Sequence, residues 1–178
     1  MDRLGSLERC ASATFCTNPD LSSTIGQRCG SLLGLKAIRS SFEYLSDRCG
    51  TVDIDAIFHE VSEAEERIGY ACDKYLRRFD PPLAGIFGNS SYALFAAGML
   101  EKYLDADIAF IGARNDAGPS PYPTEVVKDL GRVEELLEEH TPDLILGSTY
   151  EHSLRPGITF IGLIPPLRNR LLLHAHPL

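Results

Sequence analysis

The chain contains 178 residues, of which 44 % are hydrophobic and 24 % are charged, and its formal net charge is −8 at pH 7. This composition fits one folded domain with an appendage and argues against a disordered chain. The negative charge disfavours nucleic-acid binding, no apolar run is long enough to span a membrane, and no signal-peptide core follows Met1.

The sequence pattern of residues 1–80 predicts a helical lead-in to the following domain, with one possible short strand. Residues 7–15 could form that strand. A helix is predicted from Asn18, an N-cap residue followed by proline, to Gly30. Apolar residues at three- and four-residue spacing predict two further helices, from about Gly34 to Cys49 and from Asp53 to about Phe79.

The cysteine pattern indicates a reducing compartment. The five cysteines stand at positions 10, 16, 29, 49 and 72. Their odd number argues against a disulfide framework, and no Cys-x-x-Cys spacing suggests a self-contained zinc or ferredoxin-type site. We therefore expect a cytoplasmic protein, in which Cys29 and Cys49 pack near the ends of helices.

Residues 81–178 show an alternation of strands and helices. Short, nearly continuous apolar runs predict strands at 82–88, 106–112, 143–148 and 158–164, with helices at 89–103 and 124–140 and a short helix before the last strand. This pattern predicts a Rossmann-like three-layer α/β/α domain with a parallel sheet of about four strands, preceded by the helical segment. No helix pattern follows the last strand, so we expect the domain to be truncated at its C-terminus.

Ligands of parallel sheets bind beyond the carboxyl ends of the strands. Two segments at such ends are candidates for ligand binding: Gly88, Asn89 and Ser90 after the first strand, and Ser148, Thr149 and Tyr150 after the third. The first segment leads into a helix and offers backbone N–H groups to an anion. Neither the Walker spacing nor the dinucleotide spacing occurs, so glycine here could equally serve close packing of strand and helix.

Three other segments allow more than one interpretation. Residues 113–123 form a long Gly/Pro/Asn-rich loop, which indicates either a binding role or disorder. Ser148 and His152 lie close in sequence, but the Gly-x-Ser-x-Gly turn of serine hydrolases is missing, so nucleophilic catalysis is not expected. His174 and His176 could face the same side, but two histidines do not complete a metal site.

The order of these motifs resembles the nitrogenase component 1 family. Gly34-Leu35-Lys36-Ala37 resembles a glycine-led helix start of that family, Pro142–Tyr150 resembles its Pro-Asp-Leu strand and turn, and Gly157–Gly162 resembles a later strand. The family includes the molybdenum–iron protein chains, cofactor scaffold proteins, dark protochlorophyllide and chlorophyllide reductases, and nickel-sirohydrochlorin cyclase. The match corresponds to the C-terminal part of a family subunit only.

The resemblance implies a domain of a metallocluster oxidoreductase subunit that is inactive alone. A related subunit would form a heteromer with it, and an ATP-dependent iron protein would deliver electrons through an iron–sulfur cluster. The cysteines for that bridging cluster belong to an N-terminal domain outside this sequence. We therefore expect an iron-containing cluster in the full assembly and none bound by this chain alone.

The resemblance also implies a role for Cys16 as a metal ligand. Cys16 falls near the position where the catalytic chain of molybdenum nitrogenase ligates its cofactor, and soft sulfur suits iron clusters. The second ligand of that chain corresponds to about Ile164, which cannot bind metal, so a true nitrogenase cofactor is not expected. For Cys16, the alternative is a buried structural thiol. For the protein, the alternatives are a non-catalytic scaffold for a metallocluster or tetrapyrrole, or a truncated paralogue with an interaction role.

Overall fold

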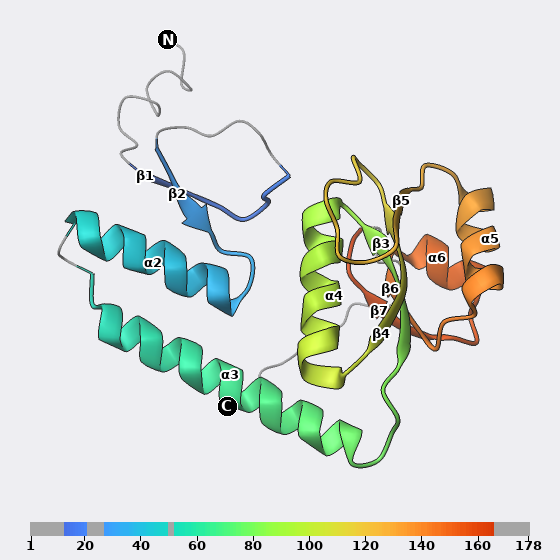
Figure 1. Cartoon of the computed structure of the whole chain (residues 1–178), viewed down its shortest axis with the longest axis horizontal. Helices are drawn as coiled ribbons and strands as arrows, with labels where there is room; N and C mark the ends of the chain where they lie inside the picture. The colour runs from blue at the N-terminus through green and yellow to red at the C-terminus, as the bar shows by residue number, and fades with distance from the viewer. Residues whose placement is uncertain (1–12, 21–26, 50–51, 166–178) are drawn as a thin grey trace, which may run out of the picture. The chain divides into compact units, whose positions relative to one another are not determined.

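The computed structural model describes residues 13–20, 27–49 and 52–165 (Figure 1). The chain divides into two compact units, Met1–Lys74 and Tyr75–Leu178. The division falls close to the predicted one after residue 80.

The described part of the first unit combines two short strands with two helices. Its described elements are β1 (Ala13–Cys16), β2 (Gln27–Ser31), α2 (Leu35–Cys49) and α3 (Ile54–Leu76). The strands β1 and β2 pair in parallel. Both helices lie where the apolar spacing predicts them, and α3 begins directly after Asp53, whose Oδ1 accepts a hydrogen bond of 3.1 Å from the backbone N–H of Ala56.

The predicted helix from Asn18 to Gly30 is wrong over its described end, because residues 27–31 form β2. Cys29 therefore lies in a strand and not near a helix end. A Cβ atom on Gly30, whose φ is +154°, would collide with the side chain of Ser41 on α2. This glycine serves a close approach of β2 to α2 and does not end a helix. Residues 21–26 lie outside the described part.

The predicted early strand is described only at its end. Residues 13–15 belong to β1, whereas residues 7–12 lie outside the described part. The described part of the lead-in thus contains two strands, β1 and β2, where one was expected.

The second unit is an α/β domain around one parallel sheet. Its elements are β3 (Leu83–Gly88), α4 (Ser90–Leu104), β4 (Asp107–Ala113), β5 (Thr124–Val126), α5 (Leu130–His140), β6 (Leu144–Gly147), α6 (Thr149–Leu154) and β7 (Thr159–Gly162). The five strands pair in the order β5-β4-β3-β6-β7, and every pairing is parallel. The Rossmann-like α/β prediction is confirmed, with one strand more than the four expected.

Helices cover both faces of this sheet, with α4 on one face and α5 and α6 on the other (Figure 1). One buried cluster joins the α4 alanines at 93, 96 and 97 to alternate residues of β3, including Ile86. A second cluster joins Phe87, Phe110 and Ile145 to the buried face of α5. Successive residues of β3 thus point into different layers, which is the alternation expected of a pleated strand.

Thr124 does not cap a helix, contrary to the prediction. Residues 124–126 form β5, which pairs with the end of β4. The helix begins only at Leu130, and its N-cap is Asp129, whose Oδ1 accepts from the backbone N–H of Arg132 at 2.8 Å. The apolar pair Val126–Val127 fits a helix face equally well in sequence, but the open edge of β4 offers backbone partners that a helix would leave unpaired.

Candidate functional site

The candidate site is a pocket of about 730 Å³ at the carboxyl edge of the sheet in the second unit. The chain moves from β3 outward to β4 and β5, and then returns to the other side of β3 as β6 and β7. The sheet therefore has its topological switch point between β3 and β6, where open α/β sheets bind ligands. The volume lies within the range of roughly 300–1,000 Å³ that is typical of small-molecule sites.

The lining comes from the segments that follow all five strands. The described lining residues are Asn89, Tyr92, Arg114, Lys128, Leu130, Ser148, Tyr150, Leu163, Ile164 and Pro165. Both charged side chains in this set, Arg114 and Lys128, are cationic. The remainder divides into polar groups and an apolar wall, so the pocket suits a ligand that has both an anionic and an apolar part.

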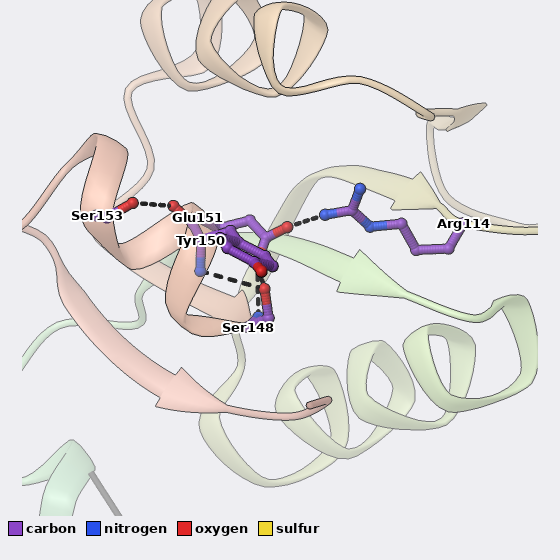
Figure 2. A network of polar contacts seen from close by, with 5 residues as sticks. All are labelled: Arg114, Ser148, Tyr150, Glu151 and Ser153. Carbon is purple, nitrogen blue, oxygen red and sulfur yellow. Dashed lines mark hydrogen bonds and ion pairs between the residues drawn. The ribbon is translucent and has the colours of Figure 1, made fainter. Parts of the chain in front are cut away.

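An ion pair between Arg114 and Glu151 lies at the edge of the pocket. Arg114 follows β4, and its Nη2 donates to Oε1 of Glu151 on α6, 37 residues away (Figure 2). The backbone N–H of Arg114 donates to the carbonyl of Gly88 at 2.8 Å, which ties the residue to the end of β3. Because β4 and β6 both border β3 but not each other, the ion pair bridges the carboxyl end of the central strand.

The Glu151 carboxylate is fully buried, and protein donors satisfy both of its oxygens. Oε1 takes the Arg114 hydrogen bond, and Oε2 accepts from the backbone N–H of Ser148 at 2.6 Å and from the Ser148 hydroxyl. Ser148 and Glu151 also form the capping box of α6 (Figure 2). The Arg114 side chain is 25 % exposed. Burial lowers the pKa of its guanidinium below the ordinary value, which still leaves it charged at neutral pH.

The second cation, Lys128, is exposed, and no ion pair joins it to another described residue. Among the described residues, Glu151 offsets the charge of Arg114, so Lys128 gives this part of the lining an excess of one positive charge. In a chain with a formal charge of −8, this pocket is a local exception.

The start of α4 is tied to the loop that follows β4. The Oδ1 atom of Asn115 accepts from the backbone N–H of Ser90 at 2.7 Å and from its hydroxyl at 3.0 Å. Asn89 occupies the N-cap position but makes no side-chain cap hydrogen bond. The Ser90 N–H is thus used within the protein, whereas Asn89 lines the pocket.

The structure brings three of the predicted site residues together at the pocket: Asn89, Ser148 and Tyr150. The other predicted residues of the sheet edge lie beside it, with Gly88 ending β3, Ser90 starting α4 and Thr149 starting α6. The Ser148 hydroxyl donates to Glu151, and no hydrogen bond joins it to the His152 ring in the described structure. The His152 ring packs against Phe160 at 4.7 Å between centroids.

Sequence reasoning missed the two cations and Glu151. Arg114 lies in the long loop at 113–123, which the sequence indicates as a candidate binding segment, and its position directly after a strand is the signal that could identify it. Glu151 belongs to a Ser-x-x-Glu capping box, which is visible in the sequence. Lys128 carries no signal in the sequence, because the pattern of residues 124–140 predicts one helix and not the end of a strand at Val126.

Cys16 lies in the first unit, at the end of β1, and is not part of the pocket. The residue is 8 % exposed, and its thiol donates to the carbonyl of Asn18 at 2.7 Å. Within residues 13–20, 27–49 and 52–165, no group of three or more metal-ligating side chains comes together. One thiol supplies one ligand, so the described residues alone do not fit an iron–sulfur cluster, and the ligand role of Cys16 stays a prediction. His174 and His176 lie outside the described residues.

Comparison with known proteins adds no identification. No protein-family model matches the chain, and no curated protein matches it. None of the described helices combines the length and the apolar character that crossing a membrane requires.

Proposed function

We propose that the α/β unit binds a carboxylate-bearing organic molecule in the pocket between the ends of β3 and β6. The observation that carries this proposal is the lining, in which Arg114 and Lys128 are the charged groups and no described acidic residue takes part. Guanidinium and ammonium groups bind carboxylates through charge-assisted hydrogen bonds. The apolar wall of Leu163 and Ile164 would bury the uncharged part of the same molecule.

The apolar wall is fixed to the sheet by backbone hydrogen bonds. The N–H groups of Leu163 and Ile164 both reach the carbonyl of Gly147, at 2.8 and 3.2 Å. This arrangement supports a preformed pocket, which reduces the entropy that a ligand loses on binding.

We propose further that this pocket is the part of a cofactor or substrate cavity that the chain contributes to a nitrogenase-like oxidoreductase subunit. The order of motifs supports this placement, with a related subunit and an ATP-dependent iron protein as partners. The scattered cysteines support a cytoplasmic location. The scaffold alternative draws on the same lining, because a tetrapyrrole combines a broad apolar body with peripheral carboxylates.

A titration of the purified chain tests the ligand class. Three probes are compared by calorimetry: citrate, the tetrapyrrole coproporphyrin III, and AMP. We expect saturable binding of at least one of the two carboxylate probes. Saturable binding of AMP alone would replace the carboxylate proposal with a nucleotide site, and binding of no probe would overturn it.

Charge reversal at Lys128 tests the location. Lys128→Glu should weaken binding of the carboxylate probe about tenfold, because it replaces an attraction of about 1 kcal/mol with a repulsion. The matched control is Lys102→Glu, at the end of α4 that is far from the carboxyl edge of the sheet. Equal weakening in both variants would show that overall charge, and not the pocket, governs binding.

A further inference from the structure

We propose that Glu151 is a positioning residue for ligand binding, which holds the Arg114 guanidinium at the edge of the pocket so that its remaining N–H groups face the ligand carboxylate. This inference rests on the proposed function of the pocket and concerns how one of its cations is presented. Glu151 is not itself a lining residue, and it acts through Arg114.

The contacts of Arg114 leave donors for a ligand. A guanidinium carries N–H donors on three nitrogen atoms in a rigid planar fork. Of the three guanidinium nitrogens of Arg114, only Nη2 donates to an acceptor in the described part of the chain, namely Glu151. The fork can therefore bind a carboxylate through two parallel hydrogen bonds while the contact with Glu151 persists.

The contacts of Glu151 make it a fixed support. Its carboxylate is fully buried, and Ser148 holds one oxygen through two hydrogen bonds from a neighbouring position of the chain. With that oxygen engaged, the second oxygen has one orientation, which faces Arg114 (Figure 2). The Arg114 side chain is otherwise long and partly exposed, and without this contact it would sample many rotamers.

The positioning role and a purely electrostatic role predict opposite signs for one substitution. Glu151→Gln removes a negative charge beside an anion site. If charge alone mattered, the carboxylate probe would bind more tightly. If Glu151 positions Arg114, the probe binds more weakly. Without Glu151 the guanidinium is mobile before binding, so the free energy of binding then includes the entropy that is lost when the side chain becomes ordered.

The experiment is calorimetric titration of the full chain with whichever of citrate and coproporphyrin III binds the wild type. We expect Glu151→Gln to weaken binding about tenfold. Glu138→Gln is the matched control, because it removes one negative charge from an exposed pair with Arg155 on the same unit and should change affinity less than twofold. Unchanged or tighter binding by Glu151→Gln would overturn the inference and leave the proposed function intact. Absence of binding by the wild type would overturn the proposed function itself.

A second variant covers the case in which Glu151→Gln fails to fold. Arg114→Lys keeps the charge and the pairing with Glu151 but loses the planar fork. The inference predicts weakening of about tenfold by this variant, because the carboxylate loses the two parallel hydrogen bonds of the fork. Binding by Arg114→Lys as tight as the wild type would overturn the inference.

Discussion

Three polar residues are buried in the described part of the chain: Ser41, Ser148 and Glu151. Of these, Glu151 carries a charge. Burying a carboxylate costs several kcal/mol unless donors replace the lost water. Here Arg114 and Ser148 supply those donors. The Ser148 contacts are local and follow from the capping-box spacing in the sequence. The contact with Arg114 spans 37 residues, and it arises only because β4 and β6 border the same strand.

Tyr122 gives a residue-scale prediction about pH. Its hydroxyl donates to Oε2 of Glu101 at 2.6 Å, and burial followed by this hydrogen bond raises the pKa of Tyr122 from 10.0 to about 12. Between these two values the unfolded chain loses the phenol proton while the folded chain keeps it. The free energy of unfolding therefore falls as the pH rises from about 10 to about 12.

Chemical denaturation at several pH values checks this prediction. In Tyr122→Phe, the part of the pH dependence that belongs to this group should disappear, whereas Tyr70→Phe, at an exposed tyrosine, serves as the control. An identical slope in the wild type and Tyr122→Phe between these pH values would contradict the assignment.

At the scale of elements, β3 and β4 pack together through two glycine–phenylalanine pairs, in which each strand contributes one glycine and one phenylalanine. Gly85 lies opposite Phe110, and Phe87 lies opposite Gly112. The two rings meet edge to face, with centroids 5.3 Å apart. A Cβ atom would lie 2.5 Å from the Phe110 ring if added at Gly85, and 2.5 Å from the Phe87 ring if added at Gly112. Each glycine thus makes room for the ring on the neighbouring strand.

We expect Gly112→Ala to destabilise the second unit by about 1–3 kcal/mol, because overpacking in a filled core forces the ring or the strand to move. Thermal and urea unfolding measure the change. Gly157→Ala is the matched control, since its Cβ would meet no atom within 4 Å, and its effect should stay within about 0.5 kcal/mol. A stability of Gly112→Ala equal to that of the control would show that the sheet yields at this position.

The two errors in element prediction share a cause. Residues 27–31 and 124–126 both form short strands whose sequence also fits a helix. In strands this short, the composition of the segment contributes little to the stability of the strand conformation. Hydrogen bonding to a neighbouring strand determines whether the segment forms a strand. The partner of β5 is the edge of β4, and the partner of β2 is β1, so neither strand could be recognised before the fold was known.

At the scale of the whole molecule, the pocket and Cys16 belong to different units. A cluster ligated by Cys16 would therefore depend on the full assembly, with ligands from outside the described residues. As a ligand, the thiol would lose its proton and its hydrogen bond to the Asn18 carbonyl.

The iron content of the assembly tests this role. The protein is isolated anaerobically from its own cells with its partners, and iron per chain is measured. We expect Cys16→Ala to lower the iron content, because a cluster loses a thiolate ligand. Cys72→Ala, at a cysteine on α3, is the control and should retain full iron. Full iron in Cys16→Ala would leave Cys16 as a structural thiol.

The sequence alone determined the class of the second unit, because glycine-ended apolar runs alternating with amphipathic helices can bury their surfaces only as a covered parallel sheet. It also located the edge of the sheet at which the pocket lies, since Asn89, Ser148 and Tyr150 follow strands that must end on the same side. The tertiary structure decided the strand order, the fifth strand and the partner of Glu151. These depend on which distant segments come to lie side by side, and local periodicity carries no information about that.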